Sequence, residues 1–127
     1  MSGATNDSPQ DPRETIYDES RPWGGFRQYT HNAVSTVKII TVYPGEVLSL
    51  QFHHRRDELW VALTDGLEVT LDDRTWRPEP FEELFVPRET EHRMAGVGDS
   101  PAKWLEISFG LFDEDDIVRL EDAYGRS

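Results

Sequence analysis

The sequence contains no cysteine, so the chain forms no disulfide bond and offers no thiolate ligand to a metal ion. Long hydrophobic runs are also absent, because no stretch approaches the roughly 20 apolar residues that span a bilayer. Residues 1–10 carry neither the basic nor the apolar segment of a signal peptide. We therefore expect a cytoplasmic protein that has no membrane partner.

Positive charge is scarce and lysine is rare. The 127 residues include 25 acidic and 13 basic side chains, giving a net charge of -12, and only Lys38 and Lys103 are lysines. A negative field of this size disfavours nucleic acid as a partner. It would also repel a phosphorylated metabolite, so a substrate of that class requires a local pocket of positive charge. The length predicts one domain.

Short β-branched segments separated by glycine, proline and aspartate dominate the chain, which predicts an all-β sandwich or small barrel. Residues 1–20 form a polar N-terminal arm, and residues 21–127 form the domain. A short C-terminal helix is expected over residues 115–124. The expected strands are residues 26–30, 37–42, 47–53, 58–63, 67–71, 74–76, 84–86, 92–95 and 103–109.

Four residues in this pattern have the chemistry of a metal site. Gln51 and His53 are two residues apart, so they leave the same face of a strand. Glu58 begins the next apolar run, and a hairpin would return it beside them. His92 follows a third apolar run and could close the site. One amide oxygen, two imidazoles and one carboxylate form a plausible ligand set for a divalent metal. The alternative is that the histidines are ordinary hydrogen-bonded residues.

The neighbouring His54 points to the opposite face if the strand continues, so it is excluded from the ligand set. Glutamine supplies a neutral amide oxygen instead of a third imidazole. This weakens the site for redox-active iron and suits a Lewis-acid ion. The expected metal is zinc, with manganese, nickel and cobalt as alternatives, and isomerase chemistry is favoured over dioxygenase chemistry.

The spacing of these residues resembles known motifs over nearly the whole chain. Gly45, Gln51-x-His53, Glu58 and Gly66 resemble the first cupin motif, with glutamine in place of its first histidine. Pro87 and His92 match the second motif. The chain resembles the type II phosphomannose isomerase cupin over residues 21–126. Further matching segments are Arg21-Pro22-Trp23-Gly24, Pro44-Gly45, Leu48-Ser49-Leu50-Gln51, Arg56-x-Glu58-x-Trp60, Asp115-Asp116-Ile117-Val118-Arg119 and Glu121-Asp122-x-Tyr124-Gly125-Arg126.

This resemblance implies a single cupin double-stranded β-helix, which is a jelly-roll barrel, and a homodimer. The same domain forms the C-terminal part of bifunctional mannose-1-phosphate guanylyltransferase/mannose-6-phosphate isomerases. The implied activity is metal-dependent aldose–ketose isomerisation between mannose 6-phosphate and fructose 6-phosphate. Two alternatives stay open: a non-catalytic cupin that binds a sugar or sugar phosphate, and another cupin enzyme such as an epimerase or a dioxygenase.

Several further side chains are candidates for the chemistry. Lys38 and Glu106 are charged residues within apolar strands, and we assign them to proton transfer as catalytic candidates. Arg56 and Arg119 are substrate-binding candidates for a phosphate or sugar hydroxyls, with surface ion pairs as the alternative. Trp60 shares the face of Glu58 and is a third substrate-binding candidate, although packing in the core explains an aromatic residue there better.

The sequence departs from the family pattern at two positions that bear on activity. Leu59 stands where the family usually has histidine, and Glu89 stands where it usually has glycine. Activity would be reduced or altered if the missing histidine assisted proton transfer, or if Glu89 narrows the mouth of the pocket. These departures motivate the non-catalytic alternative.

Overall fold

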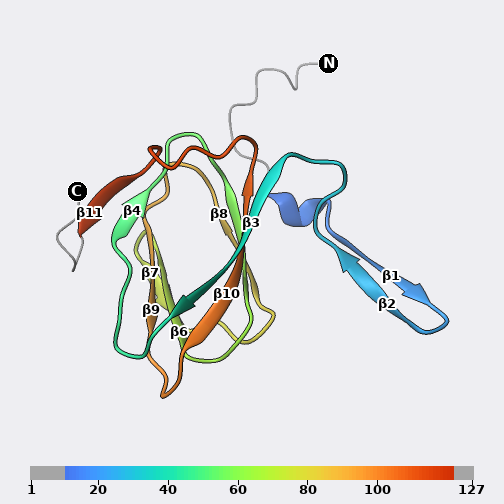
Figure 1. Ribbon diagram of the computed structural model, residues 1–127, viewed down its shortest axis with the longest axis horizontal. Helices are drawn as coiled ribbons and strands as arrows, with labels where there is room; N and C mark the ends of the chain where they lie inside the picture. The colour runs from blue at the N-terminus through green and yellow to red at the C-terminus, as the bar shows by residue number, and fades with distance from the viewer. Residues whose placement is uncertain (1–10, 122–127) are drawn as a thin grey trace.

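The computed structural model describes residues 11–121 as a barrel of two facing antiparallel sheets, from which a hairpin projects (Figure 1). No helix in this range is long and apolar enough to cross a membrane. The elements are the 3₁₀ helix η2 (Pro12–Glu14) and the strands β1 (Tyr17–Arg21), β2 (Gly24–Gln28), β3 (Ser35–Val42), β4 (Leu50–Phe52), β5 (Glu58–Ala62), β6 (Leu67–Leu71), β7 (Arg74–Trp76), β8 (Glu83–Val86), β9 (His92–Gly96), β10 (Ala102–Phe109) and β11 (Val118–Glu121).

Nine of these strands form the barrel. One sheet has the order β3-β10-β5-β8, and the other has the order β11-β4-β9-β6-β7. Strands distant in the chain lie side by side, as when β10 pairs with both β3 and β5. This topology confirms the predicted all-β cupin jelly roll.

The predicted C-terminal helix is wrong within the described residues. Val118–Glu121 is the strand β11, and it pairs antiparallel with β4. The turn at residues 114–115 leads directly into this strand. Residues 122–124 of the predicted helix lie outside the described residues. A short apolar run fits strand and helix equally well, and here pairing with an available sheet edge decides the structure.

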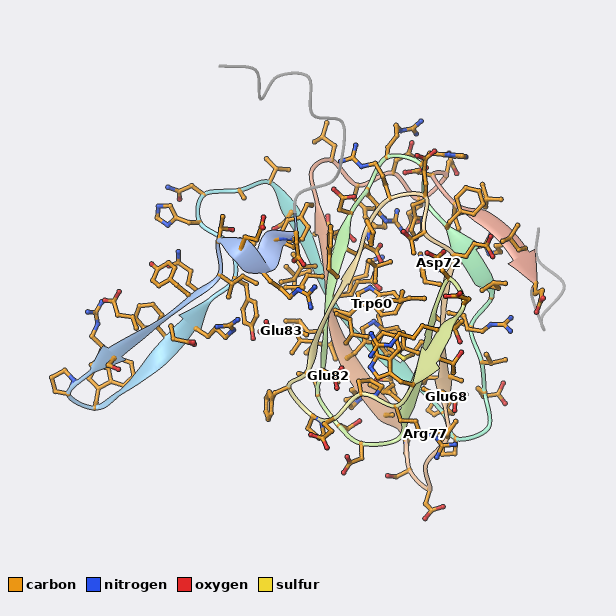
Figure 2. The ribbon with its side chains drawn as sticks, turned by 180° about the vertical axis from the view of Figure 1, so that it is seen from behind. Trp60, Glu68, Asp72, Arg77, Glu82 and Glu83 are labelled. Atoms are coloured by element: carbon orange, nitrogen blue, oxygen red, sulfur yellow. The ribbon has the colours of Figure 1, made fainter. Side chains whose placement is uncertain are left out.

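The middle of the barrel holds an apolar core contributed by both sheets. Figure 2 shows Trp60 inside the barrel, whereas Glu68 and Arg77 form an ion pair on its outer side (3.2 Å). The buried members are Val42, Trp60, Ala62, Leu67, Val69, Leu84, Val86, Met94, Ala102 and Trp104. Removing these side chains from water is the main stabilising contribution to the fold.

The two ends of the barrel differ in polarity. Along β10, the inward-facing side chains change from Trp104 to Glu106 and then to Ser108. The register pairs Trp104 with Ala62 and Ser108 with Glu58. We call the end that holds Trp104 and Ala62 the barrel floor, and the end that holds Ser108 and Glu58 the barrel mouth. The site residues gather at the mouth.

The outer face of the β3-β10-β5-β8 sheet is covered over part of its area. Leu59 and Ile107 lie under Ile16, with Tyr29 packed against the same group. Both covering residues flank the β1–β2 hairpin in the chain. The segment before the barrel therefore closes one half of this outer face and leaves the β3 half open.

Candidate metal centre

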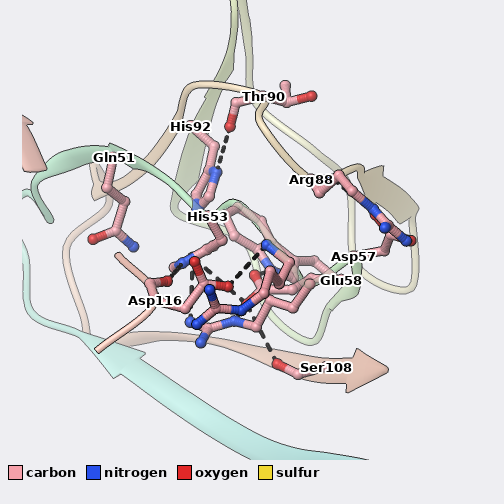
Figure 3. A network of polar contacts seen from close by, with 12 residues as sticks. Gln51, His53, Asp57, Glu58, Arg88, Thr90, His92, Ser108 and Asp116 are labelled. Carbon is pink, nitrogen blue, oxygen red and sulfur yellow. Dashed lines mark hydrogen bonds and ion pairs between the residues drawn. The ribbon is translucent and has the colours of Figure 1, made fainter. Parts of the chain in front are cut away.

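His53, Glu58 and His92 meet at the barrel mouth. Their ligand atoms all lie within 4.8 Å of one another, and each residue is at most 2% exposed. Glu58 begins β5, His92 begins β9, and His53 directly follows β4, so three strands of two sheets bring them together (Figure 3). Two imidazoles and a carboxylate at this spacing fit a divalent metal ion.

Backbone carbonyls fix the orientation of both imidazole rings. His53 Nδ1 lies 2.6 Å from the carbonyl oxygen of Asp116, and His92 Nδ1 lies 2.9 Å from that of Thr90. Because a carbonyl only accepts, each Nδ1 carries the proton and each Nε2 presents a lone pair, which in His53 faces an Arg56 nitrogen (3.2 Å). This is the arrangement that metal-ligating histidines usually have.

His92 Nε2 is the clearest sign that the residues present fit a metal. The atom is buried, and no protein group in the described chain donates a hydrogen bond to it. A buried imidazole nitrogen without a partner is costly, whereas a metal ion would use its lone pair. The rings of His53 and His92 are tilted by 40° to each other, with centroids 5.0 Å apart.

Burial and neighbouring charges keep the three side chains in the protonation states that a metal ligand needs. Burial lowers the pKa of His92 to about 4 and also lowers the pKa of His53, so both rings are neutral at pH 7. Burial opposes ionisation of Glu58, but the two imidazoles and Arg56 outweigh it and hold the pKa of Glu58 below its usual value. Neutral imidazole and ionised carboxylate are the forms that bind metals.

Gln51 is the fourth predicted ligand, and its backbone lies opposite His92 in the β4–β9 pairing. Residues opposite each other on neighbouring strands share a face, so the backbone supports a place for Gln51 beside the three buried ligands. Its amide oxygen accepts a hydrogen bond from Ser49 (2.8 Å). His54 differs, because its exposed ring packs against Phe52 on the other face.

Arg56 is a buried cation in direct contact with this group. Its Nε donates to Glu58 (2.8 Å), and its terminal nitrogens lie 3.2 Å from His53 Nε2 and from the carbonyl oxygen of Asp113. Arg56 therefore balances the charge of Glu58 and contacts two of the candidate ligand atoms, Glu58 Oε2 and His53 Nε2. Its guanidinium also stacks on Phe112, with 4.4 Å from Cζ to the ring centroid.

The loop at residues 110–117 is hydrogen-bonded to the residues that follow β4 at the barrel mouth. The Asp116 carboxylate accepts hydrogen bonds from the backbone nitrogens of His54 and Arg55 (2.9 Å each). Phe112 lies under a second cation, because Lys38 Nζ is 4.2 Å from its ring centroid. The sequence did not single out Phe112, and the roles of the Asp116 and Thr90 carbonyls carry no side-chain signal that could have revealed them.

Glu106 and Lys38 are neighbours on the inner face of the β3–β10 pair. Glu106 is 8% exposed, and burial together with the charge of Glu58 raises its pKa to about 7. A carboxyl group with this pKa exchanges a proton readily near neutral pH. Lys38 lies at the exposed edge of the mouth, where it contacts Phe112.

Trp60 and Arg119, the other substrate-binding candidates, differ in position. Trp60 is 2% exposed and donates its indole hydrogen to Glu58 (2.9 Å), so its observed contact orients a candidate metal ligand. Its ring edge also meets His92, with centroids 5.3 Å apart. Arg119 on β11 pairs with Gln51 and is half-buried on that face.

The two departures from the family pattern lie outside the ligand group. Leu59 is fully buried on the outer face of its sheet, against Ile16 and Ile107, so its side chain points away from the mouth. Glu89 is an exposed loop residue with a φ of 63°. A left-handed backbone favours glycine, which explains a preference for glycine at this position.

Comparison with known proteins agrees with this geometry. Residues 7–122 match the family model described as mannose-6-phosphate isomerase, C-terminal, and the chain belongs to this family. It is 41% identical over 108 residues to the alginate biosynthesis protein AlgA of Pseudomonas aeruginosa, covering 84% of this chain and 22% of that protein. It is 38% identical to the mannose-1-phosphate guanylyltransferase RfbM of Salmonella typhimurium, over 84% of this chain and 22% of the relative.

The chain thus spans about a fifth of the length of these curated relatives. Among solved structures, it is similar to a dTDP sugar isomerase from Desulfovibrio desulfuricans, with a TM-score of 0.64 and 15% identity. That match covers 85% of this chain and 82% of the other. At this identity the similarity supports the cupin fold alone.

Proposed function

We propose that this chain is a metal-dependent aldose–ketose isomerase that interconverts mannose 6-phosphate and fructose 6-phosphate. The observation that carries the proposal is the buried His53–Glu58–His92 group at the barrel mouth, two strand positions from a second buried acid, Glu106. Membership of the mannose-6-phosphate isomerase C-terminal family supports the same reaction class.

In this proposal, Gln51 completes the ligand set of the three buried residues around zinc, with manganese, nickel or cobalt as alternatives. A bound divalent ion supplies Lewis-acid polarisation of the sugar oxygens. Nε2 of each imidazole would hold the ion, and the carbonyls of Asp116 and Thr90 keep both rings oriented with Nε2 toward Glu58. The apolar floor below excludes water from this side of the site.

Glu106 is the proposed base for the carbon-bound proton. As a carboxylate, it takes the proton from C2 of the aldose and returns it to C1, and the reverse reaction follows the same path. Its raised pKa, about 7, matches a group that both accepts and donates near neutral pH. Lys38, its neighbour on β3, is the proposed donor and acceptor for the sugar oxygens.

The phosphate requires positive charge in a chain whose net charge is -12. Arg56 and Arg119 are the proposed partners, because Arg56 contacts Glu58 directly and Arg119 lies opposite Gln51 in the β11–β4 pairing. Trp60 is the third proposed substrate-binding residue, and its hydrogen bond also orients Glu58. We also propose that the active form is a cytoplasmic homodimer.

A coupled assay on purified protein loaded with zinc, manganese, cobalt or nickel tests this function. We expect turnover of mannose 6-phosphate that is lost in Glu106→Gln and kept in Glu114→Gln, an exposed acid of the 110–117 loop. No turnover with any of the four metals contradicts the isomerase. Calorimetry that then shows metal and sugar-phosphate binding without turnover would favour the non-catalytic cupin.

A further inference from the structure

A cavity of about 540 Å³ lies outside the barrel, apart from the metal centre. We call it the outer cavity. Its walls come from residues 11–15, from residues 28–33 and from three barrel positions, Asp57, Arg88 and Phe109. Figure 1 shows η2 and the loop between β2 and β3, which carry the first two groups, beside the barrel. The volume is within the range of roughly 300–1,000 Å³ that is usual for small-molecule sites.

The β3-β10-β5-β8 sheet separates the outer cavity from the metal centre. Asp57 and Phe109 line the cavity, whereas their chain neighbours Glu58 and Ser108 are buried in the barrel mouth. This follows from the alternation of extended chain, in which successive side chains point to opposite faces. The Phe109 backbone nitrogen donates to the Asp57 carbonyl oxygen (3.1 Å), which joins two of the cavity walls. The two sites therefore lie back to back.

The charged carboxylates of the outer cavity already have arginine partners. Asp57 accepts hydrogen bonds from the Arg88 backbone nitrogen (2.8 Å) and from its Nη2 (2.9 Å), and Figure 3 shows this pair beside the candidate metal ligands. Asp11 accepts from the backbone nitrogen (2.9 Å) and Nε (3.0 Å) of Arg13. A charged ligand would have to break one of these pairs or remain without a counter-ion, and both are costly. The cavity therefore favours an uncharged ligand.

The remaining walls combine flat apolar surface with hydrogen-bonding groups. Tyr29 and Phe109 contribute half-buried aromatic rings, and Gln28 and Thr30 contribute an amide and a hydroxyl group. A sugar ring has the same double character, because its C–H faces pack on aromatic rings while its hydroxyl groups donate and accept hydrogen bonds. The guanidinium of Arg88 offers several donors in one plane, which suits neighbouring hydroxyl groups.

We propose that the outer cavity binds a neutral sugar. The sugar ring packs against Tyr29 and Phe109, and its hydroxyl groups bind to the Arg88–Asp57 pair. Such a ligand also contacts the loop at residues 87–91, in which the Thr90 carbonyl orients a histidine of the metal centre. This site takes an uncharged ligand and requires no metal, so it goes beyond the proposed isomerase and can be tested separately.

Amide chemical shifts of the isotope-labelled chain give the first test, during titration with the methyl glycosides of glucose, mannose and galactose. A methyl glycoside has neither a free aldehyde nor a phosphate, so it is no substrate for the proposed isomerase. We expect at least one of the three to bind with a dissociation constant of about 1 mM or lower, and to shift the amides of Thr30, His31 and Arg88.

Two outcomes of this titration overturn the proposal. One is the absence of binding by all three glycosides up to about 10 mM, which is too weak for a formed site. The other is a set of shifts centred on Gln51 and Arg119, which would place the sugar at the barrel mouth. His53→Ala should bind the glycoside as the natural chain does, so failure of the metal centre and failure of the outer cavity are distinguishable.

A matched pair of variants tests where the sugar lies. Ala33→Trp places an indole ring in the outer cavity and should weaken binding at least about tenfold, because it fills the space of the ligand. Val34→Trp is the control, since Val34 is 64% exposed and is not among the lining residues. Equal affinity in these two variants contradicts a sugar in this cavity.

Two further measurements test the polar contacts and the preference for an uncharged ligand. Arg88→Met keeps the length of a side chain that is 44% exposed, so the fold should persist, but it removes the proposed hydroxyl partner. We expect binding to weaken about tenfold. The uronate of the glycoside that binds, which carries a carboxylate at C6, should bind at least about tenfold more weakly than the neutral form. An unchanged affinity in Arg88→Met, or a uronate that binds as tightly, overturns the proposed recognition.

Discussion

The barrel mouth and the barrel floor are built by the same strands but serve opposite purposes. All eight buried polar or charged residues in the described chain surround the mouth: Ser49, His53, Arg56, Glu58, His92, Glu106, Ser108 and Asp116. The floor holds apolar side chains such as Trp104 and Ala62. Burying charge costs stability, whereas burying apolar area provides it. The floor therefore stabilises a mouth that is arranged for chemistry.

The largest expected effect on stability comes from truncating a large side chain of the barrel floor. Trp104 is 1% exposed and packs on Trp60, with ring centroids 5.7 Å apart. Trp104→Ala should lower the free energy of unfolding by about 3–5 kcal/mol, because it leaves a cavity. Ser108→Ala, on the same face of β10 at the mouth, should cost about 1 kcal/mol. Urea unfolding measures both, and a larger loss in Ser108→Ala would contradict the comparison.

The second expected effect is that the barrel mouth lowers the free energy of unfolding by an amount that depends on pH. The pKa of Glu106 is raised to about 7, so its contribution to stability is complete below about pH 4.5 and is lost as the pH rises through 7. Glutamine does not ionise, so Glu106→Gln should not lose stability as the pH rises through 7. Between pH 4.5 and 8, its stability relative to the natural chain should rise by up to about 3 kcal/mol.

Urea unfolding at both pH values checks this, with Glu114→Gln as the exposed control. A difference between Glu106→Gln and the natural chain that does not change with pH would mean that folding does not raise the pKa of Glu106. In the activity assay, the same group predicts a rate that increases with pH through about 7, because the carboxylate is the base.

The smallest predicted effect concerns the rim of the mouth. Glu89 has a φ of 63° and an exposed side chain, so glycine should relieve backbone strain without removing a buried contact. Glu89→Gly should stabilise the chain by about 0.5–1 kcal/mol after the entropy of glycine in the unfolded chain is included. Glu91→Gly, also exposed but without a positive φ, should destabilise it. Thermal unfolding of the two variants distinguishes these outcomes.

The sequence predicted strands best where turn residues bound them on both sides. The strands at residues 67–71 and 74–76 were predicted with the observed bounds, between Gly66, the Asp72-Asp73 turn and Pro78. The strand β1 was missed, because Tyr17–Arg21 is mostly polar and resembles a flexible leader. The C-terminal helix was wrong because the pairing of β11 with β4 joins segments more than 60 residues apart.

For the site, strand alternation together with the expected hairpin and closing strand predicted which side chains meet, but it could not show what orients them. The spacing of His53, Glu58 and His92 predicted three residues that the structure brings together. The carbonyls of Asp116 and Thr90 orient the rings through backbone atoms, which are the same in every residue type. Such contacts depend on the path of the loops, and a single sequence carries no pattern for them.

Metal content after loading and dialysis tests the central claim most directly. The natural chain and His54→Ala, with its exposed ring, should each retain one divalent ion per chain. His53→Ala removes a buried ligand and should lower metal affinity at least about 100-fold, so that almost none remains. Equal retention, or equal loss, in the two histidine variants would contradict a metal centre built on His53, Glu58 and His92.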